Sequence, residues 1–185
     1  MNIDFDQEMN RLNAKPLNGR SDPSEKRLRE LETVLSVQLP ESYRVFLAKF
    51  GKYSVVANFE CNTLPGAYIE LFYGFPSATD DDLESVFEFD EIGIAPTALT
   101  IGCDLFGNQI VMFLAEPLNE RVYVHEHDGG ADFLDDPNWQ EAGLSWSDLP
   151  KYDHSPDKPG AFQNLHFVAE SFESFIKLLR PMSRG

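Results

Sequence analysis

Apolar residues recur at helical spacing through the first fifty residues. Asp22 as an N-cap and Pro23 at the first helical position predict a helix start. Three leucines then share one face: Leu28, Leu31 and Leu35. A second helix is predicted from Pro40 to Phe50, with Gly51 as its stop, because four apolar side chains fall on one face: Tyr43, Phe46, Leu47 and Phe50. Residues 1–21 form a lead to this helical hairpin, with a short helix through Ile3, Phe5, Met9 and Leu12.

From Tyr53 onward the apolar period becomes that of strands. Five strands are predicted, over residues 53–59, 67–73, 98–103, 109–114 and 121–125. The last three are joined by short connections and should form an antiparallel meander. Thr79–Asp82 predicts a helix start between the second and third of these five strands, since acidic side chains are stabilised at the positive, N-terminal end of a helix. A final helix begins near Ser171 and places Phe172, Phe175, Ile176 and Leu179 on one face.

These elements predict an α+β fold: an N-terminal helical hairpin, a central antiparallel sheet and a C-terminal closing helix. We expect a single domain over residues 22–180, a lead over 1–21 and a tail over 181–185. Residues 128–160 are rich in Gly, Asp, Pro and Trp and are predicted to form a long loop excursion without regular structure. Loops of that length in a small domain are often functional.

Charge is distributed unevenly along the 185 residues, whose formal net charge is −16. Residues 1–51 carry eight acids and eight bases, whereas residues 52–169 carry 21 acids and four bases, net −17. No Lys or Arg lies between Lys52 and Arg121. Nucleic acid and anionic membranes are disfavoured as partners, because both are bound through Lys and Arg. The skew favours a basic partner, and the alternative is an ordinary solvated face.

The chain start resembles no secretory signal, and no apolar run reaches the roughly 20 residues that span a bilayer. Cys61 and Cys103 lie in apolar, strand-like surroundings and are expected to be buried free thiols. We therefore expect a soluble, cytoplasmic protein.

Signatures of catalysis are scarce. The chain lacks a phosphate-binding glycine loop, a nucleophile elbow, a Cys-x-x-Cys pair and a His-Glu-x-x-His helix. His125 and His127 would share one strand face beside Asp128, an arrangement that could hold a divalent metal for hydrolysis. The alternative is a strand end whose polar side chains face solvent. We predict no enzyme activity and no cofactor.

The segment Gly102-Cys103-Asp104-Leu105-Phe106-Gly107-Asn108 lies between two apolar strands. Its Gly-Asn pair suits positive φ, and Asp104 can accept backbone N–H groups across the turn. The segment is therefore predicted to form the turn of a β-hairpin. The alternative makes Asp104 and Asn108 part of a rim that faces a partner.

Four segments together resemble the SUKH superfamily: L-P-E-S-Y-R-V-F-L-A-K-F-G at 39–51, I-G-C-D-L-F-G-N-Q-I at 101–110, V-Y-V-H at 122–125 and S-F-E-S-F-I at 171–176. The resemblance covers roughly residues 22–180 and implies the α+β fold predicted above. It also implies a non-enzymatic protein. Bacterial members are typically immunity proteins that neutralise a toxin domain, often a nuclease, and eukaryotic relatives are regulatory or scaffolding modules.

We therefore predict an immunity protein that occludes the surface of a cognate, basic, nuclease-type toxin domain. The alternative is an interaction or scaffold module without a toxin partner. The protein is expected to be a monomer or weak homodimer. Predicted partner-binding residues are rim acids, one amide and two tryptophan anchors: Asp80, Asp81, Asp82, Glu84, Asp104, Asn108, Glu126, Asp128, Asp132, Asp135, Asp136, Trp139 and Trp146.

Overall fold

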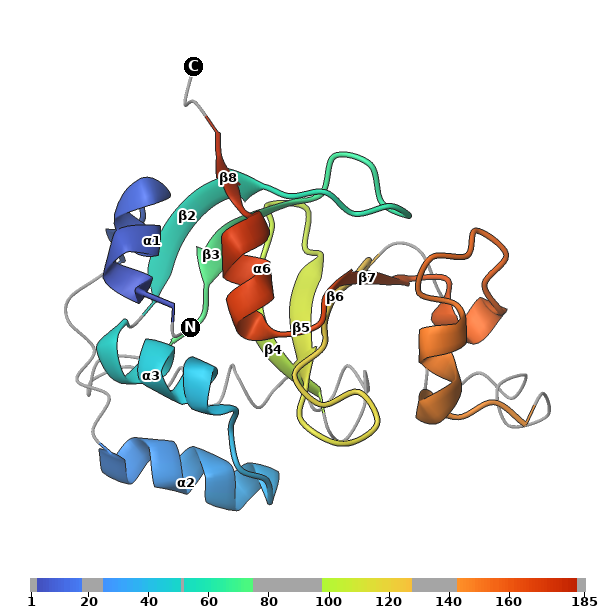
Figure 1. The fold of residues 1–185 in the computed structure, drawn as a ribbon, viewed down its shortest axis with the longest axis horizontal. Helices are drawn as coiled ribbons and strands as arrows, with labels where there is room; N and C mark the ends of the chain where they lie inside the picture. Colours follow the sequence, from blue (N-terminus) through green and yellow to red (C-terminus); the bar gives the residue numbers. More distant parts are fainter. Residues whose placement is uncertain (1–2, 18–24, 51, 75–97, 128–142, 183–185) are drawn as a thin grey trace.

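A computed structural model describes residues 3–17, 25–50, 52–74, 98–127 and 143–182 (Figure 1). The predicted N-cap at Asp22 and the predicted helix start at Thr79–Asp82 lie outside these residues.

Helices form at both ends of the described chain. They are α1 (Phe5–Arg11), α2 (Glu25–Leu35), α3 (Glu41–Lys49) and α6 (Phe172–Leu178). Side chains cap two of them, since Asp4 accepts from the N–H groups of Asp6 and Gln7, and Ser171 accepts from that of Ser174. The α2–α3 hairpin is confirmed, and Arg44 of α3 bridges Glu25 and Glu32 of α2 at 2.6 Å each. None of the described helices is long and apolar enough to cross a bilayer.

The strands described form one antiparallel sheet, which confirms the predicted α+β class. Along the sheet, β1 (Lys15–Pro16), β2 (Tyr53–Asn58), β3 (Tyr68–Phe72), β4 (Ala98–Cys103), β5 (Gln109–Phe113), β6 (Val122–His125) and β7 (Leu165–Ala169) follow in chain order, and β8 (Arg180–Pro181) pairs with β2. The meander of β4, β5 and β6 is confirmed. Strands β1, β7 and β8 were not predicted.

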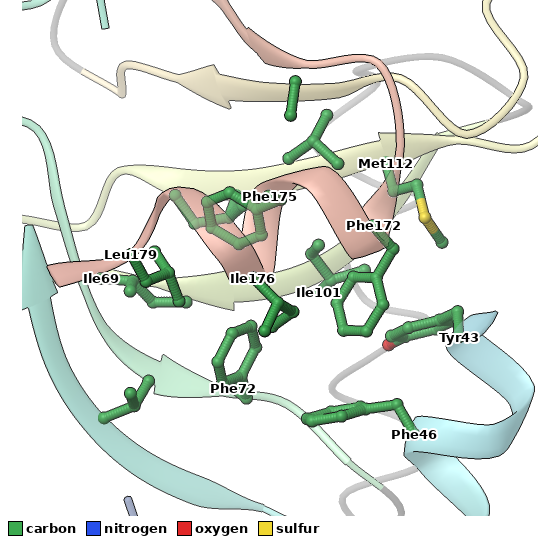
Figure 2. Packing of buried hydrophobic residues seen from close by; sticks show 14 of the residues in the cluster. Tyr43, Phe46, Ile69, Phe72, Ile101, Met112, Phe172, Phe175, Ile176 and Leu179 are labelled. Atoms are coloured by element: carbon green, nitrogen blue, oxygen red, sulfur yellow. The ribbon is translucent and has the colours of Figure 1, made fainter. Parts of the chain in front are cut away.

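The main core fills the space between the sheet and helices α1, α3 and α6. Figure 2 shows the apolar face of α6 directed toward Phe72 and Ile101 of the sheet and toward Tyr43 and Phe46 of α3. Phe172 is fully buried, and its ring centroid lies 4.9 Å from that of Tyr43 and 5.0 Å from that of Phe46. Helix α6 therefore closes the core, as predicted.

A second, smaller core lies on the opposite face of the sheet. Val111 and Phe113 of β5 point into it, whereas Ile110 and Met112 of the same strand point into the main core. The two cores cover the two faces of β5, so all residues of this strand are buried. This two-sided burial explains why the strand is a continuous apolar run without alternation.

The second core is covered by the described part of the predicted excursion. This part contains the 3₁₀ helix Trp146–Lys151 (η1), and a second 3₁₀ helix, Gly160–Phe162 (η2), begins at its last residue; both lie beside β7 in Figure 1. The expectation of a stretch without regular structure is therefore wrong for this part. Leu149 of η1 and Phe162 of η2 are fully buried against the sheet, so both 3₁₀ helices belong to the folded core.

Residues of the predicted lead also pack on the main core, and residues of the predicted tail pair with the sheet. Phe5, Met9 and Leu12, within and just after α1, are buried in it. At the other end, the backbone N–H of Met182 donates to the carbonyl of Val56 at 3.0 Å and Pro181 pairs with Ala57. The predicted lead and tail thus contribute to the same fold.

Candidate functional site

Asp104 organises the turn between β4 and β5. Its Oδ1 accepts hydrogen bonds from the backbone N–H groups of Phe106 (2.8 Å) and Asn108 (3.0 Å), and its Oδ2 accepts from the Asn108 side-chain amide (2.8 Å). Gly107 has φ +93°, a conformation that favours glycine. The predicted hairpin architecture is confirmed. Asp104 is 9% exposed, so its carboxylate is largely committed to the turn.

The tip of this turn carries two large apolar side chains that point into solvent. Leu105 is 72% exposed and Phe106 is 71% exposed. Tyr68 of β3 supports both: its hydroxyl accepts from the backbone N–H of Leu105 at 3.2 Å, and its ring meets that of Phe106 edge-on at 5.9 Å. Burial raises the pKa of the Tyr68 hydroxyl, and the backbone N–H of Leu105 moderates that shift. Tyr68 therefore remains a neutral support at physiological pH.

Carboxylates surround this tip. Asp104 and Glu70 lie close enough to Tyr68 to raise its pKa further, although less than burial does. Glu126 follows β6 at the same end of the sheet, because His125 pairs with Gln109 directly beside the turn. No Lys or Arg occurs in the described stretches 53–74 and 98–120. Lys52, just before β2, lies close enough to Cys103 to lower the pKa of that thiol. The three carboxylates outnumber this cation, so this end of the sheet is net acidic around an apolar tip.

The two histidines predicted to share a strand face are engaged by different amides. The Asn164 side-chain amide donates to His125 Nε2 at 3.0 Å, and His127 lies beside Asn108, whose Oδ1 accepts from the His127 backbone N–H at 3.2 Å. The alternative of a strand end whose polar side chains face solvent is wrong for His125, which is 8% exposed, whereas His127 is exposed. Among the described residues, no three His, Cys, Asp or Glu side chains cluster as metal ligands. Asp128, the third proposed ligand, lies outside them.

His166 is a buried histidine that sequence reasoning did not select. Its Nδ1 is hydrogen-bonded to Thr63 Oγ1 at 2.9 Å, and its Nε2 lies 3.4 Å from the Glu126 carboxylate. Burial lowers the pKa of His166, and the Lys158 ammonium lowers it further, against the opposing effect of Glu126. The imidazole is therefore neutral at physiological pH and links β7 to the residues around the acidic end.

An internal ion network fixes the segment that covers the second core. Asp153 is 5% exposed and accepts from Arg121 Nη1 at 2.8 Å and from the Tyr123 hydroxyl at 2.9 Å. Arg121 also contacts Glu170 at 3.0 Å. Burial raises the pKa of Asp153, and these donors oppose the shift. The network is structural, since it joins two strands to the covering segment.

The edge strand β7 is protected by side chains. The buried Lys158 ammonium donates to the carbonyl of Leu165, and the Cys61 thiol donates to that of Phe167 at 3.6 Å. Filled edge acceptors suppress pairing with another chain. Cys61 is a buried free thiol, as predicted, whereas Cys103 is also free but only half-buried.

A cavity of about 490 Å³ lies beneath the β2–β3 loop. Glu60, Cys61 and Arg180 are the titratable side chains among its described lining residues. These three do not pair a nucleophile with a general base, as a hydrolytic site requires.

The structure places four of the predicted partner-binding residues. Asp104, Asn108 and Glu126 meet at the acidic end of the sheet, whereas Trp146 lies over the second core, with its ring 5.5 Å from that of Phe113 and 6.3 Å from that of Phe162. The other nine lie outside the described residues: Asp80, Asp81, Asp82, Glu84, Asp128, Asp132, Asp135, Asp136 and Trp139.

Sequence reasoning missed Leu105 and Phe106 as surface residues. A signal for them was present, because both lie inside a turn that Asp104 and Gly107 define, and a tight turn directs its central side chains away from the sheet.

Comparison with known proteins places the chain in a family. A search of curated proteins gave no match. The model of the SMI1 / KNR4 family (SUKH-1) matches residues 22–178, which span most of the chain and include the second helix, the Asp104 turn and helix α6. The chain therefore belongs to the SMI1 / KNR4 family (SUKH-1).

Proposed function

We propose that this protein is an immunity protein that binds a cognate, basic toxin domain and blocks its activity by occluding its surface. Family membership supports this proposal, because the resemblance implies proteins that bind partners and, among bacterial members, neutralise toxins. A protein partner, rather than a bound substrate, is then the expected ligand.

The observation that carries the proposal is that bases within the acidic segment are bound by groups of the same chain. Of the four bases in residues 52–169, Arg121 contacts Asp153 and Glu170, Lys151 contacts Asp148, and Lys158 donates to a backbone carbonyl. These three cations are held by groups of the fold, and the fourth, Lys52, lies close to Cys103. The 21 acids of the segment outnumber its four bases and give it a net negative field.

A negative field of this kind suits a nuclease-type toxin. Such an enzyme needs Lys and Arg to hold phosphates, and an acidic inhibitor can cover that surface. Complementary charge also accelerates capture, with association rate constants of roughly 10⁸–10⁹ M⁻¹s⁻¹ attainable at low salt. We propose that the acids at 80–84 and 132–136 belong to this surface, together with Glu126 and the rim around Asp104 and Asn108.

Co-expression tests the proposal. The toxin domain encoded beside the gene should kill host cells alone and should be tolerated when this protein is produced with it. A family member from another toxin pair is the matched control and should give no protection. Persistent toxicity, with both proteins made and soluble, would show that the proposal is wrong.

An interaction or scaffold module without a toxin partner is the second candidate, and eukaryotic relatives favour it. The gene neighbourhood separates the two, since an adjacent toxin gene supports immunity and an isolated gene favours the module.

A further inference from the structure

We propose that Leu105 and Phe106 are the apolar anchor of the partner interface, inserting into a pocket that Lys and Arg side chains surround on the toxin domain. This inference rests on the proposed function and specifies where the described part of the chain makes its central contact.

Exposure distinguishes this pair from other apolar side chains. Among the described residues, Val45 (47%), Met182 (45%) and Leu17 (38%) are also exposed, but they are far apart in sequence: Val45 lies on α3, Leu17 follows β1 and Met182 follows β8. Singly scattered exposed apolar residues are ordinary on soluble proteins. Leu105 and Phe106 are adjacent and expose over two thirds of their surface, so their burial by a partner would remove more apolar area from water.

The tip is also held in one conformation before any partner binds. The carboxylate of Asp104 fixes the backbone on both sides of Gly107, and Tyr68 holds Leu105 and Phe106 from beneath. A preorganised tip loses little conformational entropy on binding, which favours affinity. Hot spots of protein interfaces are apolar or aromatic anchors that enter pockets, surrounded by polar rims.

The charge around the tip indicates which kind of partner binds there. Glu70, Asp104 and Glu126 flank the tip and outnumber Lys52, which lies close enough to Cys103 to lower the pKa of that thiol. A second copy of the chain would bring like charges together at this end. A basic domain whose cations border an apolar pocket complements both features, which is why we assign the tip to the toxin.

The test compares two variants against the toxin domain encoded beside the gene, purified in a catalytically inactive form. Leu105→Ser with Phe106→Ser removes the anchor, and Val45→Ser is the matched control on α3. Dissociation constants are measured by calorimetry, and melting temperatures check that both variants fold. A benzophenone photo-crosslinker placed at position 106, or at position 45, provides a second readout.

The double variant should bind about 100-fold more weakly, equivalent to about 2.7 kcal/mol, and the control less than threefold. Position 106, and not position 45, should crosslink to the toxin. Undiminished binding by a folded double variant would overturn this inference and leave the proposed function intact. Failure of the wild-type protein to bind overturns both. A wild-type dimer that the double variant abolishes would assign the tip to a second copy and overturn the inference.

Discussion

Replacing Asp104 with alanine removes the acceptor that closes the β4–β5 turn. Three hydrogen bonds are lost at once, two from the backbone N–H groups of Phe106 and Asn108 and one from the Asn108 side chain. The substitution leaves Leu105 and Phe106 in place, so it tests the rigidity of the tip separately from its apolar surface.

The magnitude follows from the contacts of the carboxylate. A hydrogen bond to a charged group contributes about 1.5–3 kcal/mol to stability. The turn lies at the surface, where water can satisfy the freed donors, so we take the lower limit for the two backbone bonds and nothing for the side chain. The free energy of unfolding should therefore fall by about 3 kcal/mol. For a chain of this length the melting temperature should fall by about 6–12 °C.

Urea denaturation measures the stability loss, and amide hydrogen exchange locates it. Exchange should accelerate at Phe106 and Asn108, whose N–H groups donate to Asp104. Asp104→Asn is the matched control: its amide oxygen still accepts from both backbone groups, so the loss should be only about 1 kcal/mol. Unchanged exchange at these two amides in Asp104→Ala would refute the claim that the carboxylate holds the tip.

Three further predictions concern the scaffold. Gly102→Ala should destabilise the protein by about 3 kcal/mol or more in urea denaturation, because the new Cβ would lie 2.4 Å from the backbone oxygen of Leu71. Gly66→Ala is the control: no atom lies within 4 Å of its Cβ, and its φ of +81° should cost only about 1 kcal/mol. Equal losses of stability in the two variants would contradict the reasoning. Phe172→Ala should cost about 3–5 kcal/mol by the same assay, since it removes a fully buried ring at the centre of the core, and a loss below about 1 kcal/mol would refute that placement. Burial lowers the pKa of His166 below its ordinary value of 6.5, so the unfolded chain binds more protons and stability should fall as the pH drops below 6.5. His166→Gln should flatten the pH dependence of the urea midpoint between pH 7.5 and 5, and an identical slope would contradict the buried neutral imidazole.

Local patterns were sufficient to predict much of the fold. The helices and the five strands from residue 53 to residue 125 follow from apolar spacing, since each has a face or a run that must be buried. The Asp104 turn was predictable for a local reason as well, because an Asx residue bonds to backbone a few positions along the chain.

Features that depend on distant contacts were not predictable. Strand β7 contains His166, which is hydrogen-bonded to Thr63 and whose pKa is lowered by Lys158, and nothing near His166 in sequence reveals the bond to Thr63, 103 residues away. The second core needs η1 to fold back onto β5, which local spacing does not encode. Trp146 illustrates the same limit: an aromatic ring can anchor a partner or pack on the fold, and here it packs beside Phe113.

Sequence reasoning found the negative charge of the candidate site and missed its apolar centre. The acids of the segment are visible in composition, as is the absence of bases between Lys52 and Arg121. The apolar centre was missed, although the predictable Asp104 turn carried a signal for the exposure of Leu105 and Phe106.

Titration of the purified protein into an activity assay of the toxin domain encoded beside its gene tests the central claim most directly. We predict that inhibition is complete at one equivalent and that the association rate falls steeply as salt is raised, because complementary charge drives capture. Full toxin activity in the presence of excess folded protein would contradict the proposal.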